Sequence, residues 1–251
     1  MTLLAFLVAL TVPSAEANER RFTYTYESLA MPKGVRELEP WTTVIFPRAE
    51  GEGLAFRQRM EFEVGLTDHL LTAFYLNWEA GTGGSEFTGV SSEWKLNLTS
   101  RSTQAVGVAL YGEASVGPKE SELEAKVIVD KEVGQFVVAY NLVGEFELER
   151  EEEVEADGEI EVEWEKEAVL GHRIGLSYKV GKVSLGAEIL QDTEFKGDET
   201  EILLGAGPAI GWAGKGVWGA LTVPVRFLEV ADGETEVEPA VDARVILGFD
   251  F

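Results

Sequence analysis

The sequence contains no cysteine and only two histidines among its 251 residues. Without cysteine the chain can form no disulfide, no zinc–thiolate site and no iron–sulfur cluster, and it has no cysteine nucleophile. Basic residues are also scarce, because 21 Lys and Arg stand against 45 Asp and Glu, which gives a formal net charge of -24. So acidic a chain repels the phosphates of nucleic acid, and we expect no nucleic-acid partner.

Recognisable catalytic motifs are lacking as well. The sequence has no Gly-x-Ser-x-Gly, no His-Glu-x-x-His and no phosphate-binding loop. His69 follows a turn, and His172 falls by alternation on an outward face, where it indicates an irregular register, a bulge or a packing contact. His172 and Ser177 are an odd number of residues apart and so lie on opposite faces of a strand. We therefore predict that the chain is not an enzyme and holds no cofactor or metal.

Long apolar runs are absent apart from one near the start. Leu3–Val12 is apolar but falls short of the ~18 residues of a transmembrane helix. It is followed by Pro13-Ser14 and by Ala15-Glu16-Ala17, a small-x-small site, although no Lys or Arg precedes it. We predict a signal peptide over residues 1–17, and therefore an exported chain.

Period-two alternation of apolar and polar residues dominates from residue 37 onward, as in Phe136–Leu148. The alternating runs exceed the ~5–6 residues of ordinary strands and reach the ~10 that cross a bilayer as tilted strands. Short turns alternate with longer polar segments, which predicts an all-β, up-and-down antiparallel transmembrane β-barrel over residues 37–251. A soluble β-sandwich is the alternative. About twelve strands are expected, with ten or fourteen left open, at 37–46, 54–65, 69–79, 87–98, 104–116, 120–130, 135–151, 160–179, 182–194, 201–213, 216–229 and 237–251.

The segment 18–36 precedes this pattern. Phe22–Tyr26 alternates too, but counting it as a strand would make the number odd, and Met31–Gly34 reads as a turn. We expect a short segment against or inside the periplasmic mouth of the barrel. A first strand is the alternative.

The end of the chain carries the most specific motif. Val245, Leu247, Phe249 and Phe251 occupy alternate positions. This resembles the C-terminal assembly signal of Gram-negative outer-membrane β-barrel proteins, and Gly65–Asp68 looks like a periplasmic turn common in them. The chain is similar to uncharacterised porin-like barrels of about twelve strands. The resemblance implies the outer membrane of a Gram-negative bacterium, with membrane lipid and the barrel-assembly machinery as partners.

The inward positions carry charges of both signs, so the lumen is either wet or filled with ion pairs. We predict a passive channel or carrier for small solutes with some preference for cations. The alternative is a closed, non-conducting barrel with a structural or binding role through an acidic outer hairpin. The predicted lumen-lining residues are Arg57, Arg59, Glu61, Glu63, Glu93, Lys95, Glu113, Arg173, Glu188, Arg226, Asp242 and Arg244.

That hairpin spans residues 145–165, which hold eleven Glu and one Asp against a single Arg150. Carboxylate clusters suit hard cations such as Ca²⁺, but no D-x-D-x-D-G loop is present. A solvated acidic rim is therefore the main interpretation, and a calcium site the alternative. Either version would favour cations near the mouth.

Overall fold

The computed structural model describes residues 19–48, 53–154, 160–231, 234–236 and 239–251, without the side chains of 151–154, 160–161 and 234–236. No helix in these ranges is long and apolar enough to cross a membrane. The described residues form β-strands joined by turns. The strands are β1 (Arg36–Ile45), β2 (Ala55–Gly65), β3 (Leu70–Gly81), β4 (Gly84–Thr99), β5 (Gly107–Val116), β6 (Glu120–Val133), β7 (Phe136–Val154), β8 (Ile160–Val180), β9 (Val183–Lys196), β10 (Glu199–Ala213), β11 (Val217–Thr222), β12 (Val225–Ala231), β13 (Glu234–Glu236) and β14 (Ala240–Asp250).

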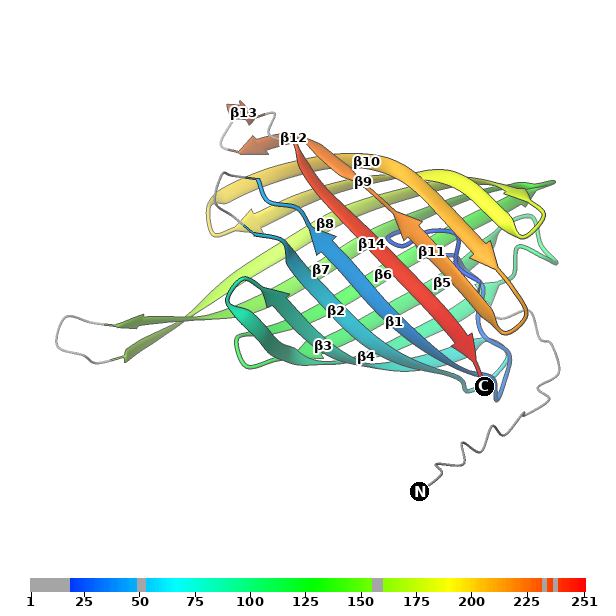
Figure 1. Cartoon of the computed structure of the whole chain (residues 1–251), viewed down its shortest axis with the longest axis horizontal. Helices are drawn as coiled ribbons and strands as arrows, with labels where there is room; N and C mark the ends of the chain where they lie inside the picture. Colours follow the sequence, from blue (N-terminus) through cyan, green and yellow to red (C-terminus); the bar gives the residue numbers. More distant parts are fainter. Residues whose placement is uncertain (1–18, 49–52, 155–159, 232–233, 237–238) are drawn as a thin grey trace, which may run out of the picture.

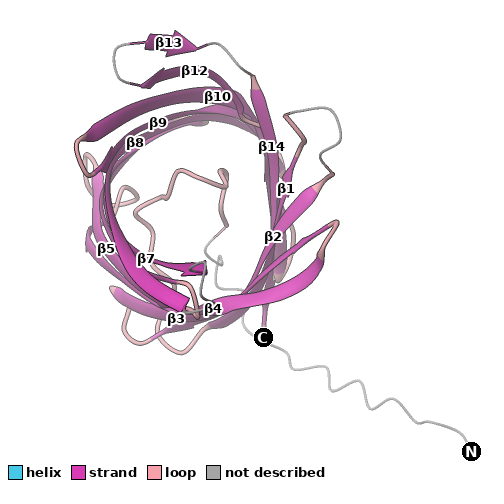
Figure 2. Cartoon of the chain, turned by 90° about the vertical axis from the view of Figure 1, so that its left-hand side faces the viewer, coloured by secondary structure: helices cyan, strands magenta, loops and turns pink. Residues whose placement is uncertain are grey.

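These strands close into one antiparallel barrel (Figures 1 and 2). Each strand from β1 to β10 pairs with the next, and β14 pairs with β1 to close the ring. β11 and β12 both lie between β10 and β14, so together they form one barrel strand, whereas β13 pairs only with β12. The barrel therefore has twelve strands, as the sequence predicted.

The predicted strand 216–229 is interrupted at Val223-Pro224. Pro224 has no N–H to donate to a neighbouring strand, and a sheet interior does not tolerate that loss without a break. Gly207 on β10 makes room for the irregularity, because a Cβ there would lie 2.1 Å from the carbonyl oxygen of Val223.

The polar segments expected as longer loops are in two cases extensions of the strands. The predicted loop 79–86 is mostly hairpin, since β3 runs to Gly81 and β4 starts at Gly84. β7 and β8 project beyond the barrel as a long hairpin (Figure 1), in which Glu149 faces Glu165 across the ladder. Residues 155–159, between these two strands, lie outside the described residues.

The two faces of the barrel differ as alternation requires. Large apolar side chains on the outer face stay exposed, among them Phe74, Trp94 and Leu176, which is the surface that lipid covers. His172 lies on this face in continuous register with β7 and β9, so the predicted irregularity is wrong. A packing contact is present instead, because the Tyr140 hydroxyl lies 2.7 Å from His172 Nδ1.

The two ends of the barrel also differ. The turns at Leu66–His69, Gly134-Gln135 and Gly181-Lys182 are short and lie at the end where the chain terminates, and the β7–β8 hairpin projects from the other end (Figure 1). Short turns face the periplasm in outer-membrane barrels. We accordingly call the former the periplasmic end and the latter the outer end.

Candidate functional site: the lumen and its inner segment

Residues 19–35, here called the inner segment, run through the inside of the barrel (Figure 2) and end at the β2–β3 turn, where Lys33 and Gly34 are exposed. They form no strand, so the first-strand alternative for Phe22–Tyr26 is wrong. Phe22 and Met31 are fully buried. Glycines on the inner face of the barrel leave room for the segment. A Cβ on Gly175 would lie 2.8 Å from the Phe22 ring, and one on Gly211 would lie 3.2 Å from Arg21 Cα.

Glu188 on β9 is the main backbone anchor of the inner segment. Its two carboxylate oxygens accept hydrogen bonds from the consecutive N–H groups of Thr23 (2.9 Å), Tyr24 (3.0 Å) and Thr25 (2.6 Å). Its side chain is fully buried, and the Thr222 hydroxyl also donates to it. A buried carboxylate needs such donors, and bonds to a charged acceptor are stronger than neutral ones.

Further strands bind the backbone of the segment through polar side chains. Asn141 on β7 hydrogen-bonds to both backbone polar groups of Tyr26. Its Oδ1 accepts from the Tyr26 N–H at 2.6 Å, and its Nδ2 donates to the Tyr26 carbonyl at 2.9 Å. Asp130 on β6 accepts from the N–H of Ser28 at 2.9 Å and from its hydroxyl at 2.7 Å. The segment has no ladder partner, so these side chains supply the hydrogen bonds that a strand would obtain from its neighbours.

A buried ion-pair network holds the middle of the segment. Arg101, in the turn after β4, places Nη1 2.7 Å from both Glu27 Oε1 and Asp130 Oδ2. Arg21 contacts Glu27 at 3.2 Å. Burial alone would raise the pKa of Glu27, but the guanidinium groups of Arg101 and Arg21 outweigh it and hold that pKa below its usual value.

Aromatic rings of the segment are covered by cations. The Arg20 guanidinium and the Lys126 ammonium lie 4.1 Å and 4.2 Å from the centre of the Tyr26 ring. The Arg244 guanidinium lies 3.9 Å from the centre of the Tyr24 ring, and its Nε donates to Thr43 Oγ1 at 2.9 Å. Desolvated contacts of this kind add to the hydrogen bonds above.

Several predicted lumen residues meet around Tyr75. Arg59 pairs with Glu113 and stacks on the Tyr75 ring at 3.9 Å. The Tyr75 hydroxyl lies 2.6 Å from Glu61 Oε1 and also contacts Glu93. Lys95 is buried nearby, 5.9 Å from the Tyr26 ring centre. Charges of both signs thus fill this part of the lumen.

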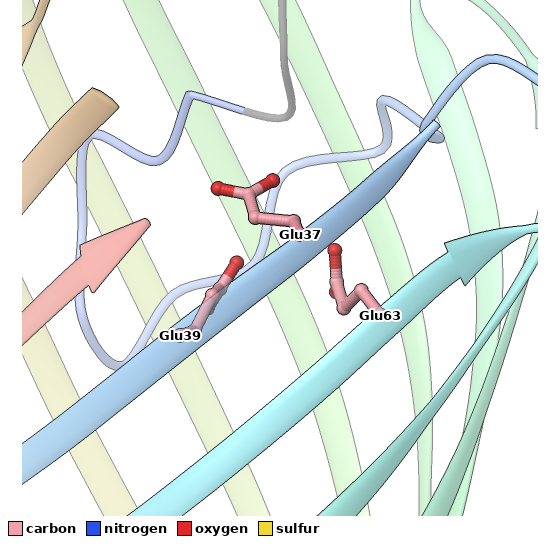
Figure 3. A group of neighbouring side chains, drawn as sticks. All are labelled: Glu37, Glu39 and Glu63. Atoms are coloured by element: carbon pink, nitrogen blue, oxygen red, sulfur yellow. The ribbon is translucent and has the colours of Figure 1, made fainter. Parts of the chain in front are cut away.

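Five carboxyl groups gather on the inner faces of β1, β2 and β4, and we call them the buried carboxylate cluster. Two of its members, Glu37 and Glu39, extend from β1 toward Glu63 on β2 (Figure 3). Glu37 and Glu39 are not among the residues that sequence analysis selected. The cluster consists of Glu37, Glu39, Glu61, Glu63 and Glu93.

The remaining predicted lumen residues lie apart from that centre. Arg57 is exposed and pairs with Glu79 at 2.9 Å, and Arg173 pairs with Asp192 at 2.6 Å. Arg226 and Asp242 are partly buried.

Acidic residues dominate the outer half of the lumen. Two half-exposed triads have carboxylate oxygens within 4.8 Å of one another, Glu120–Glu122–Glu147 and Glu122–Glu124–Glu145. Lys126 pairs with Glu124 at 2.7 Å.

The proposed assembly-signal residues Val245, Leu247, Phe249 and Phe251 are all exposed; the first three lie on the lipid side of β14, and Phe251 follows it. Sequence analysis missed Asn141, Asp130 and Arg101, which bind the inner segment. Alternation places Asn141 on the inward face but does not show what it contacts there, and Arg101 lies in a turn, where alternation gives no signal.

Comparisons with solved structures identify barrels of the same fold. The chain is similar to the KdgM porin, with a TM-score of 0.53, 10% identity, and coverage of 86% of this chain and 99% of that chain. It is also similar to the NanC porin, with a TM-score of 0.54, 9% identity, and coverage of 85% and 100%. A comparison with curated proteins found no match.

The shared fold and the apolar outer face place the chain in the outer membrane of a Gram-negative bacterium, in contact with its lipid. A family model described as "Family of unknown function (DUF6662)" matches residues 14–242. That range includes the inner segment and nearly the whole barrel. The chain therefore belongs to the family DUF6662.

Proposed function

We propose that the chain is a passive outer-membrane channel for small solutes, closed at its periplasmic half by the inner segment and selective for cations at its outer half. In this proposal the inner segment is a plug whose displacement opens the path. The observation that carries it is the nature of the interface, in which polar side chains from four strands bind the segment backbone, since Asn97 on β4 also donates to the Ser28 carbonyl at 2.6 Å.

Such an interface supports a removable plug. A segment held by apolar packing alone would leave a bare apolar lumen when withdrawn, whereas Glu188, Asn141 and Asp130 can be satisfied by water instead. The fold shared with the KdgM and NanC porins is consistent with a channel.

The cation preference is supported by the charges of the outer half. Carboxylates around a partly hydrated lumen raise the local concentration of cations, and salt screens the effect. Arg57 and Lys126 each neutralise one carboxylate, Glu79 and Glu124, so the charge of the remaining carboxylates is left.

A closed, non-conducting barrel is the second candidate. The same anchors favour it, because a segment bound through four strands and the Arg101–Glu27 pair stays in place unless something pulls it out. The two candidates differ in whether the segment leaves the lumen without a partner.

An engineered disulfide separates them. The double variant carries Arg21→Cys and Gly211→Cys. A Cβ on residue 211 lies 3.2 Å from Cα of residue 21, which is within reach of a disulfide bridge. The native chain has no cysteine, so no other bridge can form. Planar-bilayer conductance is measured for the oxidised and reduced double variant, the native chain and a chain lacking residues 19–33. Folding is controlled on a gel, where the unheated, folded barrel migrates differently from the heat-denatured chain.

We expect steady conductance with a cation-selective reversal potential from the deletion variant, intermittent conductance from the native and reduced chains, and none from the oxidised chain. A folded deletion variant that does not conduct would overturn the channel proposal. If the native and reduced chains are as silent as the oxidised one while the deletion variant conducts, the barrel is closed until a partner removes the segment.

A further inference from the structure

The buried carboxylate cluster has more negative charge than its surroundings neutralise. Glu37, Glu39, Glu61 and Glu93 are 0% exposed, and Glu63 is 2% exposed. A carboxylate buried away from water is unfavourable unless it is paired with a cation or fully hydrogen-bonded. The cluster therefore requires something to compensate five neighbouring acidic groups.

Protein groups supply only part of that compensation. The indole N–H groups of Trp218 and Trp41 donate to Glu37 and Glu39, respectively. The Tyr75 hydroxyl lies within hydrogen-bond distance of both Glu61 and Glu93. Arg20 Nη1 approaches Glu39 Oε2 at 3.8 Å, and no other ion pair to the cluster is present among the described residues. Each member keeps one buried oxygen without a hydrogen-bond partner, namely Glu37 Oε2, Glu39 Oε1, Glu61 Oε2, Glu63 Oε2 and Glu93 Oε1.

Glu63 is the residue that indicates a ligand. It extends from β2 toward Glu37 and Glu39 on β1 (Figure 3). Its buried Oε2 has no hydrogen-bond partner within the described structure. It also belongs to both groups of carboxylates whose oxygens lie within 4.8 Å of one another, Glu37–Glu39–Glu63 and Glu61–Glu63–Glu93. A buried acidic side chain at the centre of such a set has the placement of a metal ligand.

We propose that Glu37, Glu39 and Glu63 bind one divalent cation of the Ca²⁺ class at the periplasmic end of the lumen. Ca²⁺ takes six to eight oxygen ligands at about 2.3–2.6 Å, so two oxygens on opposite sides of the ion are up to about 5 Å apart. The oxygens of Glu37, Glu39 and Glu63 all lie within 4.8 Å of one another, which is compatible with that ion.

The acidic triads of the outer half do not make the same case. Glu120, Glu122 and Glu124 are exposed or only partly buried, so water compensates them, and Lys126 neutralises Glu124. They provide the matched control, because their number and chemistry resemble those of the cluster while their exposure differs.

The two tryptophans offer a direct probe. Trp41 and Trp218 hydrogen-bond to proposed ligands, so Tb³⁺, an oxygen-seeking substitute for Ca²⁺, would be sensitised by excitation of these rings. The full-length refolded barrel is stripped with a chelator and titrated with Tb³⁺, and Ca²⁺ is then added as competitor. We expect one saturable site, with emission lost on adding Ca²⁺ and reduced severalfold in the Trp41→Phe/Trp218→Phe variant.

Ligand variants complete the test. We expect Glu63→Gln to weaken Tb³⁺ binding at least tenfold, and Glu122→Gln to leave it unchanged. The proposal is overturned if the folded native chain shows no saturable site, which would mean that protons neutralise the cluster. It is also overturned if emission depends on Glu122 but not on the two tryptophans. Should Glu63→Gln fail to fold, the tryptophan variant and the Ca²⁺ competition still decide.

Discussion

Glu188 and Glu194 lie on the same strand, face the same lumen and are both glutamates, yet their surroundings are opposite. Glu188 is fully buried and accepts three backbone N–H groups of the inner segment. Glu194 is partly exposed and lies across the ladder from another carboxylate, Glu201. In this barrel, position along a strand decides whether an inward carboxylate binds the inner segment or contributes to an acidic, hydrated half.

The largest expected effect comes from removing the Glu188 anchor. Glu188→Ala leaves three buried N–H groups without their charged acceptor, which should destabilise the seated inner segment by about 3 kcal/mol. The measurement is maleimide labelling of a Thr25→Cys variant, whose site is 1% exposed in the native fold. Labelling should accelerate on the order of 100-fold. The matched change Glu194→Ala should leave the labelling rate unchanged. An equal acceleration in both variants would show that Glu188 does not bind the inner segment more strongly than Glu194 does.

Asn141 should follow with a smaller effect. Asn141→Ala removes two bonds to the Tyr26 backbone, and we expect a cost of about 2 kcal/mol in the same labelling assay. Asn77→Ala is the control, because Asn77 also lies in the lumen but bonds to Arg59 and Ser91 and not to the inner segment. Faster labelling in the control than in Asn141→Ala would argue against the assignment of anchors.

Substitutions in the outer half of the lumen should change the ion selectivity of the barrel and not its stability against unfolding. Replacing Glu120, Glu147 and Glu194 together by Gln removes like-charge repulsion, so the unfolding midpoint should stay constant or rise slightly. In a barrel lacking residues 19–33, the reversal potential across a KCl gradient should move toward the non-selective value. The difference from the unsubstituted barrel should shrink as salt increases, since salt screens the field. Unchanged selectivity at low salt would remove the outer half from the proposed function.

A smaller, pH-dependent effect is expected at Glu27. Its pKa is held below the usual value in the folded state, so its contribution is present at neutral pH and is lost as pH falls through that lowered pKa. Labelling of Thr25→Cys with a dipyridyl disulfide, which reacts with thiols in acid, should therefore be faster below about pH 4, relative to labelling of an exposed cysteine at the same pH. Glu27→Gln should flatten this dependence, whereas Asp198→Asn, in the exposed β9–β10 turn, should not.

The barrel itself was predictable because alternation is a property of each strand alone. Phe136–Leu148 shows its lipid and lumen faces without any knowledge of neighbours, and the strand count follows from such runs. The break at Pro224 was not recognised, although a proline within an expected strand was the available signal.

The contacts of the inner segment were not predictable in the same way. Phe22–Tyr26 alternates but forms no strand, and the partners Asp130, Asn141 and Glu188 are distant in the sequence. The alternation of apolar and polar residues shows that a side chain faces inward, but not which residues it contacts there. The hairpin extension at 79–86 was missed because polar residues suggest a loop, whereas strands continue outside the membrane with polar side chains on both faces.

The contact between Tyr24 and Arg244 has a consequence for how the barrel is assembled. Arg244 belongs to the last strand, which closes the ring by pairing with the first, and its side chain spans that seam to Thr43 and Tyr24. The Tyr24 contact therefore exists only in the closed ring, and it lowers the free energy of the closed ring relative to an open sheet. The seam joins strands that are some 200 residues apart, the longest separation of any strand pair in the barrel, so the inner segment stabilises the pairing whose loop has the largest closure entropy.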